Sequence, residues 1–224
     1  MGIFRKKSLV FIILALTVLS AGCMDRKTPA EEMFDKLEKV VEIEQTFEEQ
    51  QEPLVKLEKE EKELYAQLIE LNMDEYEKIV NLSDQAISIA DKRKEHIDKE
   101  KDSIEESKKE FSGVSDIIEK IDDPELKRQA EELQSLMIER YDIHSDLYNY
   151  YSTGLSQDKE LYALLKNKDL TIEELEDQVN KVNSSYKKVL DSNQKFNEKT
   201  DQYNEAKLEF YRAAGLNVKT QDNK

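Results

Sequence analysis

The sequence predicts an all-α protein, an elongated antiparallel up-down four-helix bundle with coiled-coil-like packing. Only 5 glycines and 3 prolines occur among 224 residues, and 38% of the residues are charged, a composition that favours long helices over sheets. Apolar residues recur at heptad spacing in four long segments. The connections between these segments are short, so consecutive helices must run antiparallel.

The first 22 residues differ from the rest of the chain and predict an export signal. A positive stretch, Arg5 to Lys7, precedes an apolar run, Ser8 to Leu19, which is shorter than the roughly 20 residues needed to span a bilayer. Small residues, Ala21 and Gly22, then lead to Cys23, the only cysteine. This pattern resembles the lipobox of bacterial lipoproteins, although Ser20 stands where leucine is usual. An ordinary signal peptide with a chance cysteine is the alternative.

The lipobox resemblance implies a lipid anchor. Cleavage would fall between Gly22 and Cys23, the thiol of Cys23 would carry diacylglyceryl, and the new N-terminus would be acylated, as by palmitate. Two acyl chains anchor a protein stably, so the chain is expected on the outer, extracytoplasmic face of the cell membrane. Loss of residues 1–22 removes three basic residues and changes the formal charge from −16 to −19. Residues 23–28 would then form a short tether.

The first helix is expected to start at Pro29, because Thr28 is a good N-cap and Glu31 completes a capping box. Heptad rows then continue until Asn72 to Asp74. Pro53 lies inside the pattern and predicts a kink near residues 50–52. Because Pro53 could also detach the first segment, a three-helix bundle with an N-terminal helical arm is the alternative fold.

Three further helices follow. The second is expected over about Asp74 to Ile121, with a possible break at Ser112-Gly113, and the third starts at Pro124 after an Asp123 cap. The fourth begins at a Thr171 capping box and ends at Gly215, a left-handed C-cap. The predicted bundle domain therefore spans residues 29–215, and the polar tail, residues 216–224, is expected to be disordered.

The residue inventory argues against most catalytic and cofactor chemistry. An acidic chain repels nucleic acid, and the three glycines after residue 23 form no phosphate-binding loop. Neither zinc spacing nor a calcium-binding loop occurs. Of the two histidines, His144 falls on an apolar row and is expected in the core, whereas His96 is expected to be exposed. No catalytic residue, metal ligand or cofactor is predicted.

One tract, Tyr141 to Tyr151, stands out as a candidate partner surface, because tyrosines combine an apolar face with a polar tip. Tyr141 and Tyr148 also lie on or near the apolar rows, so a core role is the alternative, and Tyr150 is the best candidate for an exposed aromatic residue. Several polar residues interrupt the rows, and they either fix helix register or mark a place where another chain binds or the helices open. These residues are Gln50, Glu61, Arg93, Asn193 and Thr200.

The lipobox, the acidic helical body, the Tyr141 to Tyr151 tract and the closing segment Phe210 to Gly215 together resemble the YkyA-type cell-wall-binding lipoproteins of Gram-positive bacteria. The resemblance implies a helical bundle on the outer face of the membrane and transfers no site residue beyond Cys23. Because teichoic acids are polyanions like this chain, the wall partner is expected to be peptidoglycan glycan, its stem peptides or a wall or membrane protein.

The predicted function is therefore a membrane-anchored, extracytoplasmic, non-enzymatic lipoprotein with a cell-wall-associated binding or scaffolding role. An accessory solute- or ion-binding lipoprotein is the alternative, and a wall-modifying enzyme is the least favoured reading. Neither the binding partner nor the oligomeric state follows from the sequence.

Overall fold

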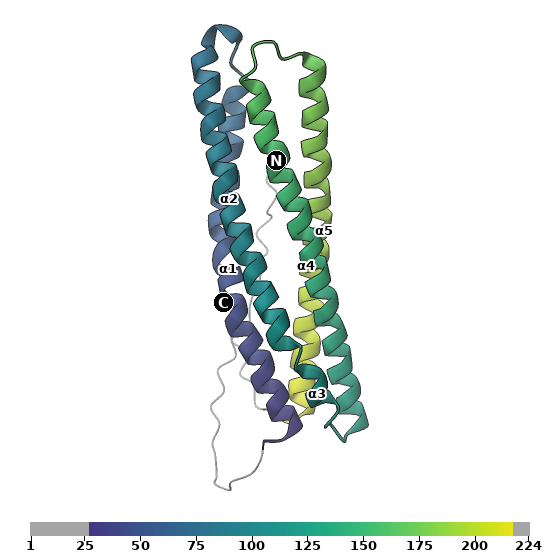
Figure 1. Cartoon of the computed structure of the whole chain (residues 1–224). Coiled ribbons are helices and arrows are strands. Elements are labelled where there is room, and N and C mark those ends of the chain that lie inside the picture. Colours follow the sequence, from purple (N-terminus) through teal and green to yellow (C-terminus); the bar gives the residue numbers. More distant parts are fainter. Residues whose placement is uncertain (1–26, 217–224) are drawn as a thin grey trace. The chain divides into compact units, whose positions relative to one another are not determined.

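The computed structural model describes residues 27–216, and within them it confirms an all-α fold of four long helices without strands (Figure 1). The predicted signal peptide, Cys23 and residues 217–224 lie outside the described residues. No helix in residues 27–216 is both long enough and apolar enough to cross a membrane. In chain order the helices are α1 (Pro29–Leu68), the 3₁₀ turn η1 (Met73–Glu75), α2 (Tyr76–Phe111), α3 (Val114–Ile118), α4 (Pro124–Leu165) and α5 (Ile172–Ala213).

The predicted starts of α1, α4 and α5 and the predicted end of α5 are confirmed. By contrast, α1 ends at Leu68, before the expected Asn72, and α2 begins at Tyr76, after the 3₁₀ turn that contains Asp74. The backbone N–H of Glu31 donates to Thr28 Oγ1, and the Glu31 carboxylate accepts from the N–H of Thr28. Thr171 and Glu174 repeat this capping box at the start of α5. After α5, Gly215 has a φ of +70°, and the N–H of Leu216 donates to the carbonyl of Tyr211, which closes a Schellman motif.

Two interruptions differ in their effect. Ser112-Gly113 ends α2, and the chain restarts as the short helix α3, so the expected continuous second helix is divided. Pro53 instead lies inside an unbroken α1, where it removes one backbone hydrogen bond. The alternative prediction of a detached N-terminal arm is wrong. Leu54 and Leu68 after Pro53 and Met33 before it are all buried, so the helix packs against its neighbours on both sides of the proline.

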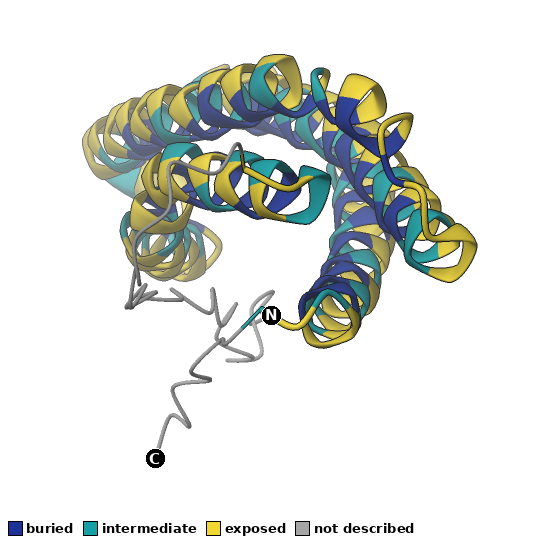
Figure 2. Ribbon diagram, turned by 90° about the horizontal axis from the view of Figure 1, so that it is seen from below, coloured by how far each residue is buried: buried dark blue, intermediate teal, exposed yellow. Residues whose placement is uncertain are grey.

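The described residues divide into two units, and each long helix contributes one segment to both. Unit 1 contains residues 46–101 and 144–194, and unit 2 contains residues 27–45, 102–143 and 195–216. In both, buried residues follow one side of each helix and exposed residues the other (Figure 2). This arrangement is the one that heptad spacing predicts.

The apolar rows form the core of each unit. In unit 2, the short helix α3 buries Val114, Ile117 and Ile118. Its other fully buried side chains include Met33, Leu37, Val40, Leu133, Met137 and Phe210. Unit 1 has two clusters of buried residues. One contains Leu54, Ala90, Ile97, Tyr151, Leu155 and Val189, and the other contains Leu68, Ile79, Ala86 and Tyr162.

Candidate functional site

The tyrosine tract of α4 does not form one surface. Tyr141 is only 3% exposed in unit 2, and its hydroxyl shares a hydrogen bond with Ser107 Oγ. Burial, together with the charge of Glu44, raises the pKa of Tyr141 well above its usual value. Tyr141 therefore packs in the core, and its role as a contact surface, one of the two predicted alternatives, does not fit this placement.

Tyr148 is half-buried in unit 1 and faces α2. Its hydroxyl donates to Asp98 Oδ1 at 2.8 Å. The ammonium groups of Lys94 and Lys101 each lie 5.3 Å from the centre of its ring. Both cations are within cation–π distance of the ring, and such contacts contribute about 0.5–1 kcal/mol each at partly exposed sites. This cluster of Tyr148, Lys94, Lys101 and Asp98 is called the Tyr148 patch below.

Tyr150 lies on another side of α4. Two residues along a helix correspond to a rotation of about 200°, so Tyr148 and Tyr150 cannot share a face. Tyr150 is half-buried rather than exposed, and the ammonium of Lys188 on α5 lies 5.5 Å from its ring centre. Of the three tyrosines proposed from sequence, one is buried and two face different neighbouring helices.

The expectation for the two histidines holds for His144 but not for His96. His144 is 4% exposed and makes an edge-to-face contact with Phe47, which confirms its place in the core. His96 is half-buried rather than exposed, and its Nδ1 bonds to Gln50 Oε1 at 2.8 Å. Burial lowers the pKa of His96, so neutral imidazole is favoured at this position.

The largest buried polar group of unit 1 surrounds Arg93, which is 3% exposed. Its guanidinium donates to Glu61 Oε2 and, through Nη2 at 2.8 Å, to the hydroxyl of Tyr151. Glu58 and Asp158 each place a carboxylate oxygen 3.5 Å from the guanidinium. The contacts come from α1, α2 and α4, so this arginine ties three helices together.

The Arg93 cluster contains more carboxylates than cations. Burial, followed by the charge of Glu61, raises the pKa of Asp158 to about 7, and burial raises the pKa of Glu58. Tyrosine hydroxyls supply the remaining donors: Tyr151 donates to Glu58, and Tyr186 of α5 donates to Asp158. The cluster thus includes α5 as well, and near neutral pH it is stabilised partly by protonation and partly by neutral donors.

Glu100 is a second buried carboxyl in unit 1. The amide of Gln51 donates to its Oε1. Burial, with a smaller contribution from the charge of Glu58, raises the pKa of Glu100 to about 8. A carboxyl in this environment is largely protonated at neutral pH, which avoids the cost of a buried charge.

Unit 2 contains its own buried arginine, Arg140, which is 1% exposed. It makes a bidentate pair with Glu44 through bonds of 2.9 and 2.8 Å, and its Nε donates to Thr200 at 2.9 Å. The guanidinium carbon lies 4.6 Å from the ring centre of Phe196. Ser107 of α2 also donates to Glu44, so contacts from all four long helices meet here. Sequence reasoning missed both Arg140 and Glu44.

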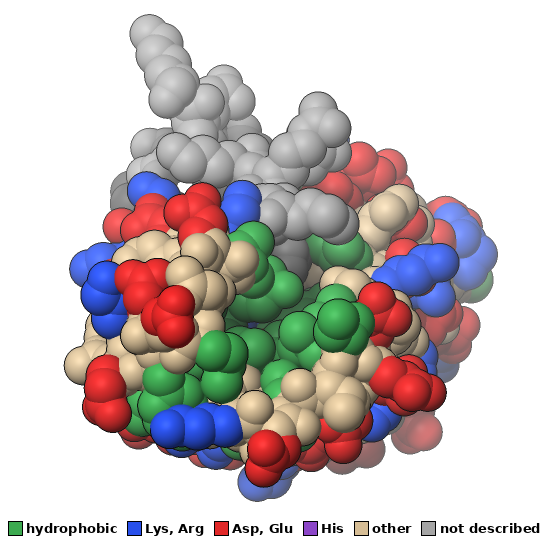
Figure 3. All heavy atoms as spheres, turned by 90° about the horizontal axis from the view of Figure 1, so that it is seen from above, with side chains coloured by type: hydrophobic (Ala, Val, Ile, Leu, Met, Phe, Trp, Pro, Cys, Tyr) green, Lys and Arg blue, Asp and Glu red, His purple; other side chains and the backbone are tan. Residues whose placement is uncertain are grey.

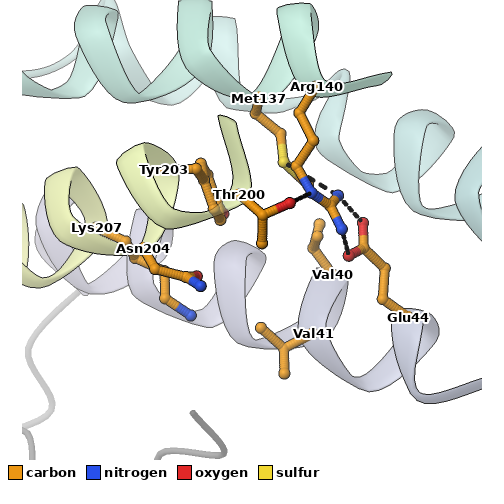
Figure 4. A pocket seen from close by; sticks show the side chains of 9 residues that line it. All are labelled: Val40, Val41, Glu44, Met137, Arg140, Thr200, Tyr203, Asn204 and Lys207. Atoms are coloured by element: carbon orange, nitrogen blue, oxygen red, sulfur yellow. Dashed lines mark hydrogen bonds and ion pairs between the residues drawn. The ribbon is translucent and has the colours of Figure 1, made fainter. Parts of the chain in front are cut away.

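A small cavity of about 10 Å³ adjoins the Arg140–Glu44 pair in unit 2 (Figure 4). Lys207 also borders it, and burial lowers the pKa of that lysine. The buried hydroxyl of Tyr203 finds no partner among the described residues. A polar cavity of this size holds one water molecule, so it has no room for a metabolite.

Metal binding finds no support in the described part of the chain. Within residues 27–216, no group of three or more His, Cys, Asp or Glu residues is placed to hold a metal ion. The densest carboxylate group, around Arg93, already contains the guanidinium as its cation.

Comparison with known proteins identifies the family. Residues 28–213 match the family YkyA, described as "Putative cell-wall binding lipoprotein". The chain belongs to the YkyA family. It is 40% identical over 205 residues to the uncharacterized lipoprotein YkyA of Bacillus subtilis (strain 168), an alignment that covers 92% of each chain. The resemblance inferred from the lipobox and the tyrosine tract is thereby confirmed.

A solved structure supports the YkyA-family fold. The 1.6 Å crystal structure of a conserved protein of unknown function from Staphylococcus aureus superposes with a TM-score of 0.72. The superposition covers 84% of this chain and 97% of that one, at 19% identity. At this identity the likeness concerns the fold alone.

Replacing Arg93 should destabilise the YkyA-family bundle. In Arg93→Met the neighbouring carboxylates lose their only guanidinium partner, and breaking a buried ion pair costs about 3–5 kcal/mol. The loss should be larger at pH 8 than at pH 5, because protonation relieves the uncompensated charge. Chemical denaturation at the two pH values measures it. Arg128→Met, at an exposed position, is the matched control and should change the free energy of unfolding by less than about 1 kcal/mol; equal effects of both variants would contradict the assignment.

Glu100 should make stability decrease as the pH rises. Its pKa is about 8 in the fold against the ordinary value of 4.5 for a glutamate side chain, so between these values the folded state holds a proton that the unfolded state has released. Stability from this group is therefore present at low pH and is lost between about pH 5 and pH 8.

Glu100→Gln removes that dependence. Relative to the unmodified chain, the variant should gain on the order of a few kcal/mol at pH 8 and little at pH 5. Denaturation curves across this range test the expectation. Glu95→Gln, at an exposed position of the same helix, is the matched control. A gain independent of pH would show that Glu100 is not the titrating group.

Proposed function

We propose that this YkyA-family protein is anchored to the outer face of the cell membrane through lipidated Cys23 and binds or scaffolds components of the cell wall without catalysing a reaction. The observation that carries the proposal is the family match over residues 28–213, which begins five residues after the lipobox cysteine. A lipoprotein family match and an independent lipobox support the same anchor.

The proposed domain organisation follows from the helix boundaries. Residues 1–22 are the signal peptide, and residues 23–28 form the tether, because α1 starts at Pro29. Residues 29–215 form the helical domain, whose last described turn closes at Gly215. Residues 216–224 remain as the polar tail.

A binding role, rather than catalysis, is supported by where the ionisable groups lie. Three carboxyls with raised pKa values, Glu58, Glu100 and Asp158, are largely buried and accept hydrogen bonds from side chains of unit 1. A fourth, Glu48, is exposed; desolvation raises its pKa, and Glu49 is the only charged neighbour that adds to this. The cavity beside Arg140 holds no more than one water. The three buried carboxyls therefore act in the packing of the helices rather than on a substrate.

The Tyr148 patch is the proposed wall contact. A half-exposed ring within cation–π distance of Lys94 and Lys101, with Asp98 beside it, offers stacking and hydrogen bonding to a sugar ring or to a stem peptide. With a formal charge of −19 after cleavage, the protein repels teichoic acids. The neutral glycan and the stem peptides are consequently the favoured partners.

Replacement of the cysteine should detach the protein from the membrane. Cys23→Ser leaves no thiol to carry diacylglyceryl, so the protein should move from the membrane fraction to the soluble or secreted fraction, and metabolic labelling with radioactive palmitate should be lost. Ser20→Ala, inside the same motif, is the control that should keep both. Membrane retention of Cys23→Ser would contradict lipid anchoring at this residue.

Wall binding should be measurable by sedimentation. The acylated mature protein, solubilised in mild detergent, should sediment with purified sacculi, and removal of teichoic acids should preserve the binding. Tyr148→Ala should weaken it about five- to tenfold, the usual loss for an aromatic contact. Tyr150→Ala, on another side of the same helix, is the matched control.

Two other results of this experiment would change the proposal. Sedimentation that requires both teichoic acid and Mg²⁺ would indicate cation bridging by the acidic surface. An absence of sedimentation in every condition would remove direct wall binding and leave a protein partner, which cross-linking on intact cells would identify.

A further inference from the structure

One end of unit 1, where α1 joins α2 and α4 joins α5, exposes an unusual amount of apolar surface. Within residues 27–216, five large hydrophobic side chains are exposed, and three of them lie in or beside these two connections. They are Ile69 at 65%, Met73 at 51% and Ile172 at 77% exposed. Single exposed hydrophobic residues are ordinary, but a local group of them marks an interaction site.

The core below this end is incompletely covered. The cluster of Leu68, Ile79, Ala86 and Tyr162 comes from α1, α2 and α4. On α5, Leu175 and Val182 occupy the heptad row of Val189, yet both are half-buried, whereas Val189 is 1% exposed. Viewed onto this end, hydrophobic side chains gather around a hollow (Figure 3). The first turns of α5 thus carry an apolar row that the unit does not fully bury.

The rim of the hollow is strongly acidic. Residues 69–78 and 166–181 contain nine acidic and four basic residues, a greater density of negative charge than the chain has on average. All four lysines already have partners, and Lys181 donates to Gln178 Oε1 at 3.5 Å. Lys78 pairs with Glu75, Lys166 pairs with Asp84, and the ammonium of Lys168 lies 4.1 Å from the ring centre of Tyr76. An incoming group therefore meets carboxylates around apolar side chains.

We propose that this end of unit 1 is a docking site for a basic amphipathic helical segment of a partner protein. Such a segment would place its apolar face against the row of Leu175 and Val182 and its lysines or arginines against the acidic rim, which is the helix-in-groove mode of recognition. Charge excludes the other occupants that apolar surface suggests. A second copy of this chain, an anionic lipid surface and teichoic acid would each bring negative charge to a negative rim.

The proposed docking site is separate from the proposed wall contact, because it involves neither Tyr148 nor any wall polymer. Its test reads peptide binding, so failure of one experiment leaves the other intact. The mature chain from Cys23 is purified in acylated form in nanodiscs of uncharged lipid, and empty nanodiscs provide the background.

The probe is a fluorescent helix-forming peptide of about 18 residues, or five turns, with leucines on one face and lysines on the other. Two further peptides are compared with it: one carries glutamate in place of lysine, and one has the same composition in an order without an apolar face. Fluorescence anisotropy should show the leucine–lysine peptide binding at least about tenfold more tightly than either. Raising the salt from about 0.05 M to about 0.5 M should weaken the binding.

Paired variants locate the site. The double variant Ile172→Ser with Val182→Ser should weaken peptide binding about tenfold, because apolar contact is lost. The double variant Glu173→Lys with Glu176→Lys should weaken it by a similar factor, because the new lysines repel the basic peptide. The matched controls lie at exposed positions of unit 2: Ile138→Ser for the apolar pair and Glu131→Lys with Glu205→Lys for the charge pair. Neither control should change the affinity by more than about twofold.

Equal binding of the peptide with no apolar face, or equal losses in the unit 2 charge variant, would reduce the effect to general attraction by an acidic protein and overturn the proposal. Circular dichroism confirms that each variant keeps its helices. If the Val182 variant unfolds, the charge pair, which touches only exposed positions, decides the outcome by itself.

Discussion

The alignment of the helices in each unit depends on one buried guanidinium. All four long helices contact it, either directly or through one other side chain. In unit 1, Arg93 of α2 meets carboxylates of α1, and α4 and α5 supply the tyrosines and Asp158 that complete the cluster. In unit 2, Arg140 of α4 meets Glu44 of α1 and Thr200 of α5, and Ser107 of α2 donates to the same glutamate. Burying a charge is costly, so only an alignment that brings all these partners together is tolerated.

This constraint explains why the apolar rows do not need to be perfect. A heptad row by itself permits helices to slide by a heptad, because one leucine resembles the next. A planar guanidinium with several donors in fixed directions does not permit such a slip without leaving a buried charge unpaired. The contacts of Arg93, Glu61 and Thr200 thus favour register selection among the alternatives that the sequence left open.

Local signals were enough to predict where α1, α4 and α5 start and where α5 ends, whereas pairing across helices was not predictable. Thr28, Thr171 and Gly215 act through residues no more than five positions away, so their patterns are legible in a single sequence. Arg140 occupies the heptad position between Leu133 and Leu147. The sequence analysis did not identify it as a core residue, because an arginine in an apolar row is buried only when a partner such as Glu44 faces it. That partner lies 96 residues away.

The three candidate tyrosines do not share one surface, for a related reason. Spacing in sequence indicates which residues share a side of α4, but it does not indicate which neighbouring helix covers that side. Tyr141 is covered in unit 2, while Tyr148 and Tyr150 face α2 and α5 and stay half-exposed. The sequence predicted a possible break of the second helix at Ser112-Gly113. Beyond this break α3 forms, because it buries Val114, Ile117 and Ile118.

Charge restricts what a protein of this composition can bind, and the restriction applies equally to both proposed surfaces. With the proposed signal cleavage the formal charge would be −19, so anionic headgroups and teichoic acids are expected to repel the chain. It can therefore bind where its own cations are concentrated, as at Lys94 and Lys101 beside Tyr148, or where a partner brings cations. The acidic rim around Ile172 is suited to the second case, because the partner's positive charge would be neutralised while its apolar face covers Leu175 and Val182. The proposed lipid anchor would then have a clear use, since it would hold at the membrane a body whose charge would otherwise drive it away.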